Sequence, residues 1–122
     1  MNNRKVLLIE DNLMNMELAT DLLEAAGYEV LKAERAEAGI AIAVAQQPDI
    51  ILMDIALPGM DGLEATRRLK EDARTARIPV VALTASAMRG DNDKARSAGC
   101  CGYIAKPIDT RLFAKVVSDF MR

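Results

Sequence analysis

The sequence predicts an α/β fold in which five strands form a doubly wound parallel sheet covered by five helices. Short apolar runs typical of strands alternate with longer segments of helical apolar spacing along the whole chain. Right-handed crossovers between consecutive parallel strands place such helices on both faces of one sheet. The chain has 122 residues and carries no linker or low-complexity tract, so we expect residues 1–122 to form a single domain.

Five segments are expected to be strands. Residues 5–9, 50–53 and 78–84 are nearly continuous apolar runs, which are typical of strands covered on both faces. Residues 28–33 alternate between apolar and polar side chains, which favours an outer position, and residues 102–105 are a short last strand. We expect the flavodoxin-like strand order 2-1-3-4-5. In that order the chain reverses direction between the first and third strands, where such sheets place their sites.

Capping residues mark two of the helices. Asn12 can accept a hydrogen bond at the start of the first helix, which Gly27 ends. Asp61 and Glu64, three residues apart, form a capping box for the third helix. The apolar positions expected to line the buried side of the first helix are Leu18, Ala19, Leu22, Leu23 and Ala26.

The other three helices have weaker boundaries. The second begins near Ala36 and carries Gly39 in its interior, which lowers its helix propensity. The fourth is expected over about residues 87–98, and its few large apolar residues predict loose docking. Asp109 or Thr110 is expected to cap the last helix. Its apolar stripe is the clearest in the chain and contains Leu112, Phe113, Val116, Val117, Phe120 and Met121.

The composition and charge of the chain exclude several classes of partner and site. The chain has 16 basic and 18 acidic residues and a net charge of -2, which predicts a protein partner rather than nucleic acid or a membrane surface. The longest charge-free run, residues 38–48, is too short to span a bilayer, and the first ten residues lack the layout of a signal peptide, so we expect a cytoplasmic protein. Cys100 and Cys101 are neighbours and are expected to be reduced. The absence of histidine excludes a phosphohistidine on this chain.

Acidic residues follow two of the expected strands. Glu10 and Asp11 follow the first strand and Asp54 follows the apolar run of the third, so all three lie at the carboxyl edge of the sheet. At separations of about 4 to 6 Å their carboxylates would repel by up to roughly 4 kcal/mol per pair. Lys106, at the end of the fifth strand, can supply one positive charge. A divalent cation can supply the rest, and oxygen ligands favour magnesium, Mg²⁺, over zinc.

Four motifs resemble the receiver domains of two-component response regulators. They are IEDN at residues 9–12, LMDIALPGMDG at 52–62, VALTASA at 81–87 and YIAKPI at 103–108. The resemblance spans the chain, and the motifs fall in the order and spacing of that family. The finer pattern is most similar to receivers of hybrid kinases and to free-standing regulators of the DivK type.

The resemblance implies a role for each residue at the strand ends. Asp54 matches the aspartate that accepts a phosphoryl group as a carboxylate nucleophile. Asp11 and Glu10 match the acidic pair that holds magnesium, with Asp54 and the backbone carbonyl of Ala56 as further ligands and Glu10 orienting a metal-bound water. Lys106 matches the lysine that pairs with a phosphoryl oxygen. The residue after it, a proline, can adopt the cis peptide bond found in the family.

The resemblance also implies a switch and its partners. Thr84 matches the switch hydroxyl and Tyr103 the switch aromatic, whose movement would change the face made by the fourth helix, fifth strand and fifth helix. The donor would be a histidine kinase or a histidine phosphotransfer protein. No DNA-binding or catalytic segment follows the last helix, so we expect output by contact with a downstream protein, as a monomer or as a dimer formed through the switch face. If the sequence is a piece of a hybrid kinase or a multidomain regulator, the output lies in another part of that protein. The chain would not be a turnover enzyme.

Other phosphate-handling classes fit the sequence less well. A phosphohydrolase of the haloacid dehalogenase type needs a second aspartate two residues after the nucleophile, where this chain has Ala56. A flavodoxin would bind phosphate in a first loop rich in serine and threonine, whereas Glu10 and Asp11 would repel an anion there. No glycine-rich nucleotide-binding motif is present, so nucleotide binding is unsupported. A receiver that binds partners without phosphorylation would lack one of the site residues, and none is missing here.

Three positions affect the expected chemistry. Cys101 stands where the family more often has aspartate or asparagine. Ala56 and Ser86, each two residues after a site residue, are small and leave room for water. We therefore expect an acyl phosphate that hydrolyses without a side chain dedicated to blocking water.

Overall fold

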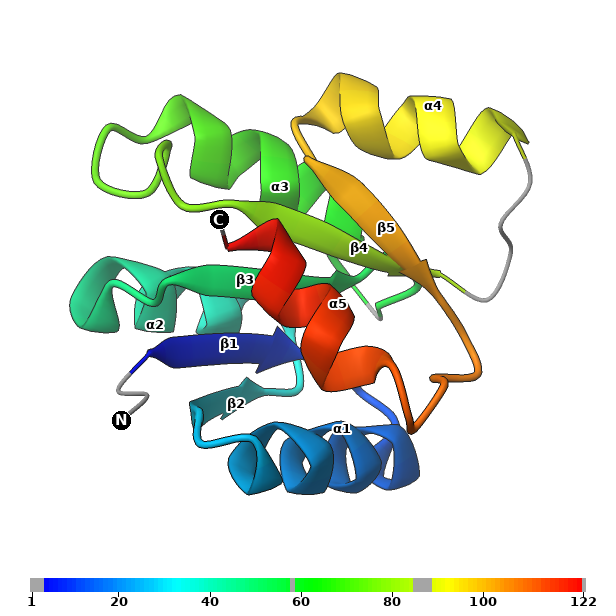
Figure 1. Ribbon diagram of the computed structural model, residues 1–122. Helices are drawn as coiled ribbons and strands as arrows, with labels where there is room; N and C mark the ends of the chain where they lie inside the picture. Colours follow the sequence, from blue (N-terminus) through cyan, green and yellow to red (C-terminus); the bar gives the residue numbers. More distant parts are fainter. Residues whose placement is uncertain (1–3, 58, 85–88, 122) are drawn as a thin grey trace.

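The protein is built around one sheet of five parallel strands. The computed structural model describes residues 4–57, 59–84 and 89–121, apart from the side chains of residues 89–92. The strand order is β2-β1-β3-β4-β5, which confirms the predicted fold (Figure 1). The strands are β1 (Lys5–Ile9), β2 (Glu29–Ala33), β3 (Ile50–Asp54), β4 (Val80–Thr84) and β5 (Gly102–Ala105).

Helices cover both faces of this sheet. Buried residues of α1 and α5 pack on one face and those of α2, α3 and α4 on the other, and Figure 1 shows α5 in front of the sheet and α1 below it. This arrangement follows from right-handed crossovers between parallel strands. The helices are α1 (Leu13–Ala25), α2 (Ala36–Gln46), α3 (Gly62–Glu71), α4 (Arg89–Ala98) and α5 (Phe113–Phe120).

The side chains of β3 alternate between two hydrophobic cores. Ile51 and Met53 pack with buried residues of α2, α3 and α4, whereas Ile50 and Leu52 pack with buried residues of α1 and α5. All four side chains are fully buried. The apolar run in the sequence therefore reflects a strand that is covered on both faces.

The two predicted capping residues hold helix ends. The side chain of Asn12 accepts a hydrogen bond from the backbone nitrogen of Asn15 at 3.0 Å. The side chain of Asp61 accepts one from the backbone nitrogen of Glu64 at 2.8 Å. Each satisfies one of the donors left free at a helix start, so the β1–α1 and β3–α3 connections have fixed ends.

The buried side of α1 differs from the prediction. Leu18 is 39% exposed and Ala26 is exposed, although both belonged to the expected apolar stripe. The helix carries two overlapping stripes, and packing against the sheet and α5 selects the one that includes a methionine and a threonine. The buried residues of α1 are Met16, Ala19, Thr20 and Leu23.

α5 begins at Phe113, so the predicted cap at Asp109 or Thr110 is wrong. The Asp109 side chain accepts a hydrogen bond from the backbone nitrogen of Arg111 at 3.0 Å. Its carbonyl accepts hydrogen bonds from the backbone nitrogens of Leu112, at 3.1 Å, and Phe113, at 2.9 Å. Asp109 therefore closes a separate turn before the helix.

Two strands are shorter than predicted. β4 begins at Val80, because the backbone nitrogen of Ile78 donates to the carbonyl of Thr75 in the preceding turn and Pro79 has no N–H group to donate. β2 begins at Glu29, one residue later than expected. Residues 87 and 88, the expected start of the fourth helix, and Ser86 lie outside the described residues.

Gly39 lies inside α2 because this helix packs closely on β1. A Cβ atom at this position would lie 2.7 Å from Cγ1 of Ile9, closer than real Cβ contacts. The glycine that weakened the helix prediction therefore serves the packing of α2.

No helix in the described part of the chain combines the length and apolarity needed to span a bilayer.

Candidate functional site

Two neighbouring strands bring a pair of carboxylates together. β1 and β3 pair in register with Ile9 opposite Met53, so the residues that follow, Glu10 and Asp54, lie at the same edge of the sheet. The backbone nitrogen of Glu10 donates to the carbonyl of Ala33 at 3.0 Å, which continues the sheet pairing to this point. Glu10 is 2% exposed and Asp54 is 3% exposed. The predicted meeting of these two acids is therefore observed, in a buried setting.

Lys106 reaches both carboxylates from the end of β5. Its Nζ atom lies 2.7 Å from Oε1 of Glu10 and 3.1 Å from Oδ2 of Asp54. The backbone nitrogen of Lys106 donates to the carbonyl of Thr84 at 2.7 Å, which fixes the lysine beside the end of β4. A buried ion pair is tolerated when geometry and hydrogen bonds compensate for the lost hydration, and both conditions are met here.

Each carboxylate also accepts a hydrogen bond from the backbone two residues further on. The second oxygen of Glu10, Oε2, accepts from the nitrogen of Asn12 at 3.2 Å. The second oxygen of Asp54, Oδ1, accepts from the nitrogen of Ala56 at 3.0 Å. These amides were not predicted, although acidic side chains at turns commonly bond the backbone two residues on. Both carboxylates are thus oriented by one lysine contact and one amide.

The two carboxyl groups differ in acidity. Burial, followed by the hydrogen bond with Asp54, raises the pKa of Glu10 above its usual value. Burial also acts to raise the pKa of Asp54, but hydrogen bonds with Glu10, the Ala56 amide and Lys106 outweigh it, so the pKa of Asp54 is lowered. Asp54 is therefore the carboxyl that the site favours in its ionised form.

Lys106 is held in its charged form. Burial acts to lower the pKa of Lys106, but its hydrogen bonds with Glu10 and Asp54 outweigh burial and raise it. The lysine therefore keeps a positive charge directly beside Asp54.

Asp11 completes an acidic cluster. One carboxylate oxygen from each of Glu10, Asp11 and Asp54 lies within 4.8 Å of the other two. Asp11 is exposed while the other two are buried, so a cation could approach from its side. A set of oxygen donors without histidine or thiolate fits magnesium. The carbonyl of Ala56, the fourth expected ligand, stays a prediction.

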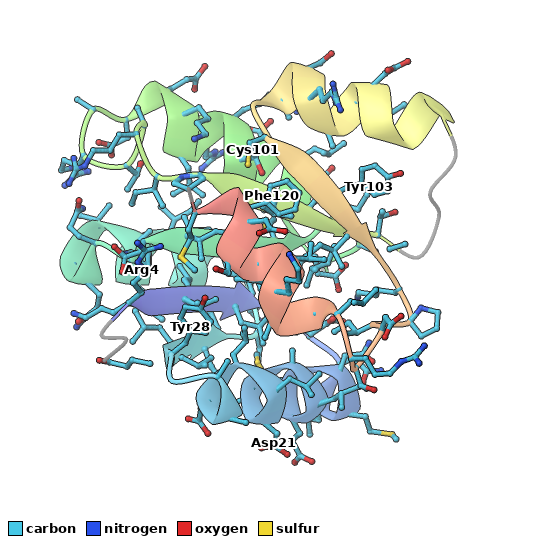
Figure 2. The ribbon with its side chains drawn as sticks, in the orientation of Figure 1. Arg4, Asp21, Tyr28, Cys101, Tyr103 and Phe120 are labelled. Carbon is cyan, nitrogen blue, oxygen red and sulfur yellow. The ribbon has the colours of Figure 1, made fainter. Side chains whose placement is uncertain are left out.

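The expected switch residues lie near the same edge. Thr84 is buried at the end of β4, where it pairs in register with Ala105. Tyr103 is half-buried in β5 and packs against the core on the α3 and α4 side (Figure 2). The Lys106–Pro107 peptide bond is cis, as the resemblance implied. The switch roles of Thr84 and Tyr103 stay predictions.

Exposed apolar side chains lie on two segments that adjoin this site. Leu13 and Met14, 64% and 80% exposed, begin α1 immediately after residues 10–12, which contain Glu10 and Asp11. Leu112, 51% exposed, lies in the turn between Lys106 and α5. Its spacing matches the α5 stripe and predicts a buried position, but Leu112 precedes the first residue of the helix and is exposed. Exposed apolar groups beside a polar site are typical of a protein contact surface.

The sequence matches the family described as "Response regulator receiver domain" over residues 6–118. It is similar to the polar-differentiation response regulator DivK of Brucella anthropi, with 42% identity over 118 residues that cover 97% of this chain and 96% of that protein. The same protein from Brucella ovis gives the same identity and coverage.

Solved structures share the fold over nearly the whole chain. A response regulator structure from Chloroflexus aurantiacus has a TM-score of 0.93 at 27% identity and covers 98% of both chains. The receiver domain of sensor histidine kinase PA1611 from Pseudomonas aeruginosa has a TM-score of 0.90 at 32% identity, also over 98% of both chains. That second structure has a magnesium ion coordinated in its active-site cleft.

The raised pKa of Glu10 predicts a pH-dependent effect of Glu10→Gln in metal-free protein. Because the pKa of Glu10 is higher in the folded protein than in the unfolded chain, the folded state binds this proton more tightly. The stability of the native protein should therefore fall as the pH rises from the unfolded to the folded pKa of Glu10. Glutamine cannot titrate. The free energy of unfolding of Glu10→Gln minus that of the native protein should therefore increase from pH 4 to pH 8, measured by urea denaturation in EDTA. A difference that is constant or decreases with pH would contradict the assignment.

Proposed function

We infer that Asp54 accepts the phosphoryl group, because this chain belongs to the response regulator receiver family, whose general role is phosphoacceptance. Asp54 is the residue that the strand-end position and the motif favour. The observation that carries the proposal is its contact with Lys106 at 3.1 Å beside the acidic cluster. The arrangement combines an ionised nucleophile with a fixed positive charge.

Transfer from a phosphohistidine is the reaction proposed for Asp54. A carboxylate oxygen attacks phosphorus, the P–N bond of the donor breaks, and the donor imidazole keeps the electron pair and takes up a proton. The lowered pKa of Asp54 keeps the nucleophile ionised. Lys106 would then pair with a phosphoryl oxygen, since its Nζ atom already lies against the carboxylate.

We propose that Asp11, Asp54, Glu10 and the carbonyl of Ala56 hold magnesium. The 4.8 Å grouping of the three carboxylates supports this assignment, as does the magnesium ion in the PA1611 receiver. When bound, magnesium would neutralise phosphoryl oxygens and align the group for in-line transfer. Asp11 is the exposed ligand, and the other two carboxylates are oriented in advance by Lys106 and backbone amides.

The proposed partners are a phosphohistidine donor and a downstream protein. Leu13, Met14 and Leu112 support donor docking, because a histidine kinase or histidine phosphotransfer protein must approach the edge that they flank. For output we propose the face of α4, β5 and α5, changed by movements of Thr84 and Tyr103. A cavity of about 330 Å³ on this face, with Tyr103 in its lining, supports a contact there.

The central prediction concerns Asp54→Asn. In magnesium and acetyl phosphate the native chain should gain one phosphoryl group, seen by intact-mass spectrometry, and Asp54→Asn should gain none, because an amide cannot form the acyl phosphate. Asp21→Asn is the matched control, since Asp21 is exposed on α1 (Figure 2) and should leave labelling unchanged. A phosphorylated histidine phosphotransfer protein should likewise label the native chain and Asp21→Asn but not Asp54→Asn.

Two outcomes would oppose this proposal. The native chain could remain unlabelled by any donor, or Asp54→Asn could be labelled to the same extent as the native chain. Either would remove Asp54 as phosphoacceptor.

The lifetime of the acyl phosphate should depend on Ala56. This residue is exposed two positions after Asp54, and its methyl group leaves room for attacking water. Ala56→Arg should slow hydrolysis several-fold by excluding water, measured as loss of the phosphoryl mass after the donor is removed. Ala26→Arg, an exposed position at the end of α1, should decay as the native protein does. Unchanged decay in Ala56→Arg would count against the water-access explanation.

A further inference from the structure

We propose that Gly62 is a positioning residue for Asp54, an inference that rests on the proposed role of Asp54. Gly62 is the first residue of α3 and is buried. It faces the end of β3, where the backbone leaves the sheet at Asp54 and Ile55. The start of α3 therefore limits where these two residues can lie.

The contact leaves no space for a side chain. A Cβ atom on Gly62 would lie 2.7 Å from Cα of Ile55, 3.0 Å from the carbonyl carbon of Asp54 and closer still to the carbonyl oxygen of Asp54. Real Cβ atoms essentially never approach other atoms within 3.0 Å. Gly62 has no positive φ angle, unlike Gly59, so this position requires a small residue rather than an unusual backbone conformation.

At two other glycines the crowding atoms belong to side chains rather than to the backbone. A Cβ on Gly102 would meet the ring of Phe120, with Cζ at 2.7 Å, and a Cβ on Gly39 would meet the end of Ile9. The ring of Phe120 is only partly buried and can turn aside, so a methyl group added at Gly102 has a neighbour that can move. At Gly62 the obstacles are backbone atoms, so an added methyl group would have to displace α3 or residues 54–55.

Hydrogen bonds hold Gly62 in place from both sides. Its nitrogen donates to the carbonyl of Ile55 at 3.3 Å, which joins the helix start to the loop after β3. Its carbonyl accepts from Oγ1 of Thr66, a fully buried residue one turn further along α3, at 2.8 Å. On the other side of this loop the Ala56 nitrogen orients Oδ1 of Asp54. A shift at Gly62 would therefore reach the carboxylate through Ile55 and Ala56.

The test compares Gly62→Ala with Gly102→Ala. Both add one methyl group, but Gly102 lies at the opposite end of β5 from Lys106 and contacts Phe120. Gly62→Ala should be phosphorylated by acetyl phosphate and magnesium about tenfold more slowly than the native chain, since small misplacement of a reacting group is costly. Gly102→Ala should stay within about twofold. Equal rates for Gly62→Ala and the native chain would overturn the inference.

A second readout separates positioning from lost stability. The Ala56 amide proton in metal-free protein reports its hydrogen bond to Asp54. In NMR spectra of Gly62→Ala this proton should move upfield and exchange faster with solvent, while in Gly102→Ala it should match the native protein. An unchanged Ala56 resonance in Gly62→Ala would oppose the inference, whatever the rate.

Thr66 provides a variant if Gly62→Ala does not fold. Thr66→Val removes the hydroxyl that holds the Gly62 carbonyl and keeps the side-chain shape, so it should slow phosphorylation and shift the Ala56 amide in the same direction. Thr66→Ser restores the hydroxyl and should recover most of the rate. Identical behaviour of the two variants would contradict the inference.

The two proposals fail in different ways. If the native chain itself took up no phosphoryl group, the role of Asp54 would fail, whereas native uptake with an unaffected Gly62→Ala would reject only the positioning role.

Discussion

The ammonium group of Lys106 is the charge that allows Glu10 and Asp54 to lie buried side by side. Its Nζ atom contacts one oxygen of each carboxylate, at 2.7 and 3.1 Å. Removing charges from water costs several kcal/mol per ion, and attraction offsets that cost only when geometry and hydrogen bonds are good. Here the two remaining oxygens accept from the backbone nitrogens of Asn12 and Ala56. All four carboxylate oxygens of Glu10 and Asp54 thus have hydrogen-bond or ion-pair partners. With Asp11 included, three carboxylates face one ammonium group, and this excess of negative charge favours a divalent cation.

The topology of the sheet creates this arrangement. β1 and β3 are neighbours although β2 lies between them in sequence, so their carboxyl ends place Glu10 beside Asp54. β5 is two strands away from β3, and only a long side chain such as that of Lys106 can cross the end of β4 to reach them. The contact of Gly62 with the backbone of Asp54 and Ile55 adds a constraint from the helix layer. Sheet order and helix packing therefore fix the same carboxylate from different directions.

The sequence was informative where local chemistry decides structure. Asn12 and Asp61 cap their helices as predicted, because capping depends on residues three positions away. The meeting of Glu10, Asp54 and Lys106 followed from their positions at the ends of parallel strands. Predictions failed where tertiary contacts choose between alternatives: the buried side of α1 includes Met16 rather than Leu18, and Asp109 closes a turn rather than capping α5. The close approach of Gly62 to β3 has no sequence signal beyond the presence of glycine.

The balance of charge in this pocket is tested most directly by magnesium titration with isothermal titration calorimetry. The native chain should bind one Mg²⁺, and Asp11→Asn should bind it at least about tenfold more weakly, because a ligand and a negative charge are both lost. Asp21→Asn, a change of equal charge elsewhere on α1, should bind as the native chain does. Equal affinities for Asp11→Asn and the native chain, or no binding by the native chain, would contradict an acidic pocket built to hold a cation beside Asp54.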